Sequence, residues 1–166
     1  MKTSPRRLGV LTVALGFFIC AGAFASEEVG HNQYPHHHLA LFVGGGFERD
    51  KMDHEENGFA LGVEYAIQFT ENWGAGLDVE YLGGGGTHRS WAAAVPLSYY
   101  LHEKWRLFAG PGMEFGSKED KYLMRVGIAY EIPFHQRWTA SPAFLVDFIE
   151  GGAKTYVLGF SVGYGF

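Results

Sequence analysis

The chain has 166 residues, enough for one domain, with 18 acidic and 13 basic residues. Its 24 glycines and 16% aromatic content are unusual for a soluble domain of this size. The acidic balance argues against nucleic acid as a partner, and a single cysteine excludes an internal disulfide framework.

Residues 1–25 have the pattern of a cleaved secretory signal peptide. A basic n-region over residues 2–7 precedes an apolar run over residues 8–19, and a small-x-small site ends at Ala25. A retained anchor and a lipidated Cys20 are weaker interpretations, because the run is short and a bulky residue precedes the cysteine. Cleavage leaves ten basic and 18 acidic residues and no cysteine.

Residues 26–37 are expected to form a polar, His-rich periplasmic leader. Imidazole suits zinc, nickel or copper, so weak metal binding is a hypothesis, with a simply solvated leader as the alternative. Zinc titration with and without this segment tests the hypothesis, and identical binding would reject it. The candidate ligands are His31, His36, His37 and His38.

The segment over residues 38–166 is expected to be all-β, because from Leu39 onward it alternates with period two and no window has a helical period. Short polar turns alternate with looser, often glycine-rich loops, as in an up-and-down outer-membrane barrel. The expected strands are 38–47, 58–69, 73–83, 90–101, 105–115, 122–134, 138–149 and 155–166.

Three similar tight turns are each followed at once by a tryptophan: Trp73, Trp105 and Trp138. Since all three begin strands, we expect them at one level, the periplasmic interface of the membrane, where amphipathic rings are stable. Three core tryptophans of a soluble β-protein are the alternative.

The last strand indicates which face lies outside. Its large residues alternate with mostly small ones, as they also do over 58–69. Small residues suit a crowded interior and make a poor solvated surface, so the apolar face is predicted to face lipid. The large residues of the last strand are Tyr156, Leu158, Phe160, Val162, Tyr164 and Phe166.

With these features, Leu39 to Phe166 resembles the small OmpA/OmpX-like outer-membrane barrels. The resemblance implies a closed antiparallel up-and-down transmembrane β-barrel of eight strands in the bacterial outer membrane. It also implies contact with outer-membrane lipid and lipopolysaccharide, and we expect a monomer. In that family, the terminal strand carries the signal read by the barrel-assembly machinery during biogenesis; the matching residues here are Leu158, Phe160, Val162, Tyr164 and Phe166.

The barrel interior is expected to hold six acidic residues and two arginines. An eight-stranded barrel is just wide enough for side chains to fill it, so a salt-bridged plug is the favoured interpretation. An ion path or gate built from the same charges is the alternative. The predicted interior charges are Glu64, Asp78, Glu80, Arg106, Glu114, Arg125, Glu131 and Asp147.

Function is the least determined property, because members of such a family include adhesion factors, anchors, small pores and lipid-modifying enzymes. The chain has no His-Glu-x-x-His or Gly-x-Ser-x-Gly motif. Ser90, His88 and Glu80 are only loosely compatible with a Ser/His/acid set. We expect a non-enzymatic barrel with a structural or surface-interaction role and no cofactor; a narrow pore for ions or very small solutes and a lipid-active enzyme are the alternatives.

Overall fold

The computed structural model describes residues 37–49, 55–84, 89–101, 104–116 and 119–166. They form ten β-strands, and among them there is no helix long and apolar enough to cross a membrane. The strands are β1 (His37–Arg49), β2 (Glu55–Gln68), β3 (Trp73–Gly84), β4 (Ser90–Ala94), β5 (Leu97–Leu101), β6 (Trp105–Phe115), β7 (Asp120–Tyr130), β8 (Ile132–His135), β9 (Trp138–Ile149) and β10 (Lys154–Gly165).

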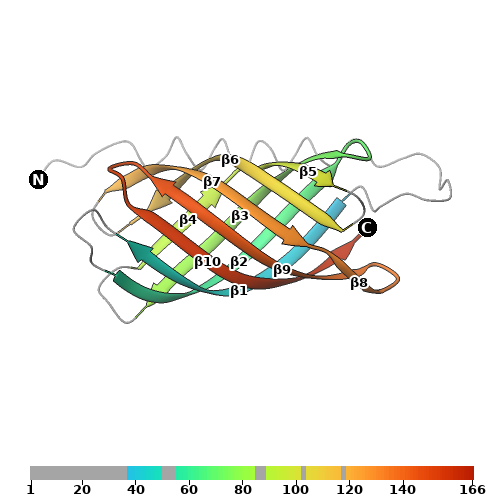
Figure 1. The fold of residues 1–166 in the computed structure, drawn as a ribbon, viewed down its shortest axis with the longest axis horizontal. Helices are drawn as coiled ribbons and strands as arrows, with labels where there is room; N and C mark the ends of the chain where they lie inside the picture. Colours follow the sequence, from blue (N-terminus) through green and yellow to red (C-terminus); the bar gives the residue numbers. More distant parts are fainter. Residues whose placement is uncertain (1–36, 50–54, 85–88, 102–103, 117–118) are drawn as a thin grey trace, which may run out of the picture. The chain divides into compact units, whose positions relative to one another are not determined.

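The strands make eight antiparallel passes around a closed barrel, as predicted (Figure 1). β4 and β5 form one pass, interrupted at Val95 and Pro96, and β7 and β8 form another, interrupted at Glu131. Proline cannot donate a ladder hydrogen bond. The carbonyl of Pro96 still accepts from the N–H of Gly76, and the N–H of Val95 donates to the carbonyl of Pro111, so the sheet continues across the break.

The barrel closes through β10, which pairs with both β9 and β1. At the end of this seam, the N–H of Phe166 donates to the carbonyl of His37 at 3.0 Å. Following the register partners once around the barrel from Arg106 leads to Ser90. Ser90 lies opposite position 116, one residue past the end of β6, so the stagger is ten residues. Such a stagger in an eight-stranded barrel tilts the strands by about 40°.

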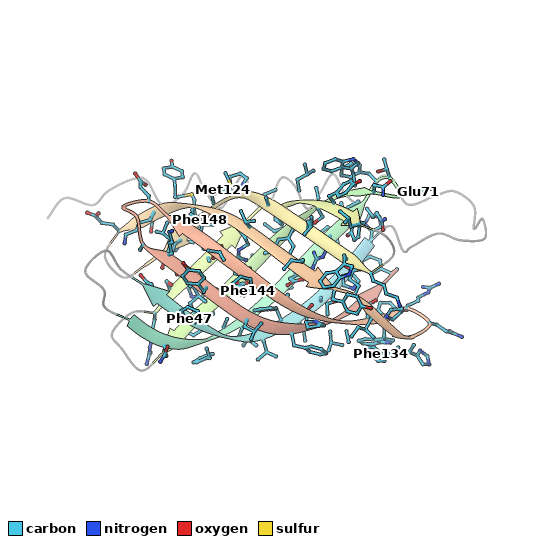
Figure 2. All side chains as sticks on the ribbon, viewed as in Figure 1. Phe47, Glu71, Met124, Phe134, Phe144 and Phe148 are labelled. Atoms are coloured by element: carbon cyan, nitrogen blue, oxygen red, sulfur yellow. The ribbon has the colours of Figure 1, made fainter. Side chains whose placement is uncertain are left out.

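Alternation along each strand separates an apolar exterior from a packed interior. Leu41 and Leu158 are 67% and 65% exposed, whereas their neighbours Phe42 and Val157 are fully buried. Figure 2 shows large side chains, including Met124 and Phe134, projecting from the outside of the barrel. Apolar residues therefore cover the exterior, which is the arrangement that lipid requires.

A belt of aromatic pairs surrounds one end of the barrel. The three predicted tryptophans begin β3, β6 and β9, which run in the same direction, so all three lie at this end. Each is paired across strands with a tyrosine, and the ring centroids are about 5 Å apart, within the range of favourable edge contacts. The pairs are Trp73–Tyr99 (4.9 Å), Trp105–Tyr130 (4.8 Å) and Trp138–Tyr164 (5.2 Å).

A second belt, which the sequence pattern does not predict, lies at the opposite end of the barrel. This is the loop-side end, where the connections 50–54, 85–89, 116–119 and 150–153 join the strands. Phe47 stacks on Tyr156 at 5.0 Å, and Tyr81 lies between Phe59 and Trp91, at 5.9 and 5.2 Å. Strand β6 runs from the first belt to the second. From Trp105 to Phe115 the strand rises ten times by about 3.3 Å, and it is tilted by about 40° from the barrel axis. The two belts are therefore about 25 Å apart, which is the height of the apolar band of outer-membrane barrels.

Apolar side chains fill the middle of the barrel, where the sequence pattern predicts only small residues and charges. Phe42 and Phe108 belong to a buried cluster with Leu145 and Val157. Their rings lie on glycines of neighbouring strands: a Cβ at Gly159 would come within 2.2 Å of Phe42, and a Cβ at Gly127 within 2.3 Å of Phe108. A side chain at either position would collide with the neighbouring ring, so the packing of Phe42 and Phe108 requires glycine there.

The lipid-facing assignment predicts that Val63→Arg destabilises the barrel. Val63 is 44% exposed and lies on β2, four residues from Phe59 in the loop-side belt, near the middle of the apolar band. The substitution should cost about 2–4 kcal/mol in vesicles, because the guanidinium must leave water. Urea unfolding followed by tryptophan fluorescence measures this cost. Glu119→Arg, at an exposed loop position, is the control, and equal tolerance of both changes would contradict the assignment.

Candidate functional site

The lumen brings seven of the eight predicted interior charges together in two clusters, each built around one arginine. They occupy inward-facing positions on five passes of the barrel, where strand alternation directs them. The Arg106 cluster consists of Arg106, Glu64 and Glu131. The Arg125 cluster consists of Arg125, Asp78, Glu80 and Asp147.

In the Arg106 cluster, the arginine links three separate parts of the wall. Its Nη2 donates to Glu64 Oε2 at 3.1 Å, and its Nε lies 3.3 Å from Glu131 Oε1. Glu64 is on β2, which is separated from β6 by two passes, so this ion pair spans the lumen. Glu131 lies at the break between β7 and β8 and is the most exposed member, at 17%.

In the Arg125 cluster, the guanidinium is completely buried and surrounded by three carboxylates. Its Nε and Nη2 donate to the two oxygens of Asp147 at 2.8 and 2.7 Å, the bidentate geometry that favours arginine over lysine. Nη2 also donates to Glu80 Oε2 at 2.8 Å, and Nη1 lies 3.6 Å from Asp78 Oδ2. Asp147 faces Arg125 on the adjacent β9, whereas Asp78 and Glu80 lie on β3, across the lumen.

Five carboxylates and two guanidinium groups leave the two clusters with a formal charge of −3 when all are ionised. Arginine stays protonated in any protein environment, so its charge must be compensated where it lies. Glu80 Oε1 and Arg125 Nη1 are buried without a hydrogen-bond partner. Carboxyl groups thus outnumber guanidinium groups in the two clusters, which makes the lumen a poor environment for anions.

Apolar side chains enclose the Arg125 cluster on both sides. On β9, Asp147 lies between Leu145 and Ile149, which belong to two different apolar clusters. On β7, Arg125 lies two residues from Leu123, which packs with Ile149 and Ala153 at the loop-side end. Buried apolar side chains therefore line the lumen on both sides of Arg125.

Glu114, the eighth predicted charge, does not join either cluster. It lies near the loop-side end of β6, is partly exposed, and forms no ion pair with either arginine among the described residues. Its backbone is paired with Lys121 of β7 and Ala92 of β4, above the apolar cluster of Leu123 and Ile149. Strand alternation correctly predicts that Glu114 points inward. Its side chain is nevertheless partly exposed at the end of the strand.

Sequence reasoning missed polar groups beside the Arg106 cluster. His38 and Tyr100 point inward and cover Gly163 and Gly74, where an added Cβ would come within 2.2 and 3.2 Å of their rings. His38 Nε2 and Ser98 Oγ are buried without a hydrogen-bond partner. Parity alone could have placed these side chains inside, because each occupies the small-residue face of its strand.

The two candidate metal ligands that the structure describes, His37 and His38, face opposite sides of β1, which begins one residue inside the expected leader. His37 stacks on Phe166 at 5.6 Å, and its Nδ1 lies 2.9 Å from the hydroxyl of Tyr65. Adjacent strand residues on opposite faces cannot share one ion. His31 and His36 lie outside the described residues, within which no group of three or more His, Cys, Asp or Glu could hold a metal.

Comparison with solved structures identifies the architecture. Neisserial surface protein A superposes with a TM-score of 0.62 at 6% identity, covering 78% of this chain and 97% of that one. The N-terminal β-barrel domain of Pseudomonas aeruginosa OprF gives 0.57 at 11% identity, covering 80% and 100%. Ail, the attachment invasion locus protein of Yersinia pestis, gives 0.52 at 12% identity, covering 80% and 100%.

No protein-family model matches the sequence, and no curated protein matches it. The structural likeness therefore concerns the fold, since identities this low carry no functional assignment. The closed barrel, its stagger of ten residues and its apolar exterior lead to the same conclusion. The chain has the fold of the small eight-stranded outer-membrane β-barrels.

Proposed function

We propose that this protein is exported to the bacterial outer membrane with loss of residues 1–25, and that it is a non-enzymatic barrel with a structural or surface-interaction role. The apolar exterior between the two aromatic belts supports the proposal most directly. A soluble protein rarely exposes contiguous apolar patches beyond a few hundred Å². In the outer membrane, lipid and lipopolysaccharide cover that surface.

The last strand supports export and assembly by the barrel-assembly machinery. Its alternate residues form one exposed row on the outside of β10, available for recognition before the barrel closes. Phe166 ends the row and stacks on His37 at the start of β1, so the same residue lies at the seam of the closed barrel. The row consists of Leu158, Phe160, Val162, Tyr164 and Phe166.

Location is tested by cell fractionation of the full-length chain expressed in a Gram-negative host. We expect recovery in the outer-membrane fraction and a faster gel mobility before heating than after it, because a folded barrel resists detergent until it is boiled. Truncation of the last three residues should reduce the folded fraction by weakening closure and recognition. Recovery as a soluble periplasmic protein would contradict the proposal.

The geometry favours a closed lumen over a pore and argues against a lipid-active enzyme. Both arginine clusters cross the lumen, and apolar side chains fill it above and between them. Two members of the Ser/His/acid set are poorly placed for catalysis. Glu80 is ion-paired with Arg125, and Ser90 is buried on the inward face of β4. His88 lies outside the described residues.

The loop-side end offers little surface for an adhesive role. The strands are joined there by segments 50–54, 85–89, 116–119 and 150–153, none longer than five residues. Connections of at most five residues provide few side chains for a binding loop, which favours a structural role with contacts at the rim.

The plug is tested with Arg125→Ala. Removing the guanidinium leaves three carboxylates facing one another in a buried site, which should lower stability by about 3–5 kcal/mol. It should also raise single-channel conductance in planar bilayers from near zero, because mutual repulsion opens a hydrated path. Arg137→Ala, at an exposed turn, is the matched control and should change neither property.

A wild-type barrel that already conducts, with conductance unaltered by Arg125→Ala, would replace the plug with the pore. If Arg125→Ala kept both the stability and the near-zero conductance of the wild type, Arg125 would not be the residue that holds the lumen together. Urea titration in vesicles and bilayer recording on the same folded preparation separate these outcomes.

A further inference from the structure

Glu64 and Asp78 lie directly opposite each other on the inner face of the barrel wall. They are register partners on the adjacent strands β2 and β3, and the side chain of each is only 8% exposed. Directly opposite residues of an antiparallel pair have Cβ atoms about 4.5–5.5 Å apart, so the two carboxyl groups are within reach of each other. The wall therefore brings together two acidic groups of like charge in a site with little access to water.

Asp78 is less well compensated by arginine than Glu64. The Glu64 carboxylate accepts a hydrogen bond from Arg106 at 3.1 Å, whereas Nη1 of Arg125 lies 3.6 Å from Asp78 Oδ2. A hydrogen bond between a guanidinium group and a carboxylate is normally about 2.7–2.9 Å long. Among the residues that the structure describes, no hydrogen bond reaches Asp78. Asp78 thus lacks the contacts that hold an ionised carboxylate in a buried site.

The guanidinium of Arg125 leads to the same conclusion. Its Nε and Nη2 donate to Asp147 and Glu80 at 2.7–2.8 Å, but its Nη1, which lies nearest to Asp78, is buried without a hydrogen-bond partner. An ionised Asp78 would be drawn to this donor, because the group is fully buried and positively charged. The unused donor and the distance of 3.6 Å fit an uncharged Asp78 better than an ionised one.

The other charges around the pair also favour a bound proton. A buried carboxyl group without compensation takes up a proton instead of remaining charged, and two carboxylates that share a site hold one proton between them. Asp147 on β9 is bound through both oxygens to Arg125. The register partner of Asp78 on β4 is Ala94, which does not titrate. The charged groups that act on Asp78 are Glu64 on β2, Glu80 on β3, Arg106 on β6 and Arg125 on β7.

We propose that Glu64 and Asp78 bind one proton between them at neutral pH, with the Asp78 hydroxyl donating to the Glu64 carboxylate. The proton is taken up from water as the barrel forms. It connects the two clusters, because Glu64 is bound to Arg106 and Asp78 lies beside Arg125. Loss of the proton places two like charges opposite each other on neighbouring strands, which weakens their pairing. This inference concerns the lumen alone and does not depend on where in the cell the barrel resides.

The bound proton makes stability depend on pH. The folded barrel holds one proton more than the unfolded chain, in which both carboxyl groups are ionised at neutral pH, so a rising pH opposes folding. In urea titrations in vesicles, the unfolding midpoint of the wild type should shift to lower urea from neutral to alkaline pH. Asp78→Asn keeps an uncharged donor opposite Glu64, so its midpoint should lack this shift.

Infrared spectroscopy of the folded protein observes the proton directly, because a protonated carboxyl group and a carboxylate absorb in separate bands. At neutral pH, the wild type should show the band of a protonated carboxyl group, and the band should disappear at alkaline pH. Asp78→Asn should lose this band. Glu64→Gln should lose it as well, because Asp78 then faces an uncharged amide and can ionise beside Arg125. Glu114→Gln is the matched control and should keep the band, since Glu114 points inward but belongs to neither cluster.

Absence of the band from the wild type at neutral pH would overturn the shared proton, as would an undiminished band in Asp78→Asn or Glu64→Gln. Loss of the band in Glu80→Gln alone would place the proton on Glu80, whose Oε1 is buried without a hydrogen-bond partner, and would also overturn the proposal. Each variant is first checked for heat-modifiable mobility, so that loss of the band is not confused with loss of the fold.

Discussion

The fully buried guanidinium of Arg125 sets the strongest constraint on this structure. It cannot lose its proton, so carboxylates must surround it, and they come from β3 and β9 while Arg125 itself is on β7. A slip of any of these strands by one residue would exchange its inward and outward faces. It would turn a charge towards lipid and leave its partners unpaired in the lumen. The ion cluster therefore makes alternative registers costly, whatever its net contribution to stability.

The same need to satisfy polar groups explains how the barrel ends. β8 extends past the start of β6 and pairs only with β9 among the described strands, so its other edge has no neighbour there. The N–H of Glu131 faces that side and donates to the carbonyl of Lys104. Along the chain, the next backbone nitrogen that faces this side belongs to Pro133, which has no N–H. The open edge thus presents no donor at this position, and this discourages pairing with another chain.

The sequence predicts the fold well because lipid reverses the usual hydrophobic pattern, and a reversed pattern of period two is visible in the residues themselves. Val63 and Leu158 show which face lies outside, and Trp73 marks both a strand start and one end of the barrel. Inward parity also selects Arg106 and Arg125. Their partners depend on the stagger of the closed barrel, which brings β2 opposite β6 and β3 opposite β7, and no local pattern encodes that stagger. The packing of Phe42 on Gly159 depends on the seam between β1 and β10, and that of Phe108 on Gly127 depends on the register of β6 with β7; neither contact was foreseen.

The lumen differs between its two ends, and this difference bears on function. At the loop-side end, Leu123, Ile149 and Ala153 cover the Arg125 cluster, and the carboxylates of Glu80 and Asp147 are 1% exposed. At the tryptophan end, Glu131 is 17% exposed. A conducting path needs polar groups of graded, moderate affinity along its whole length, whereas here the tightest ion pairs lie behind the apolar seal. This arrangement supports the proposal that the interior holds the wall together, in which case the barrel acts on its surroundings through its exterior and rims.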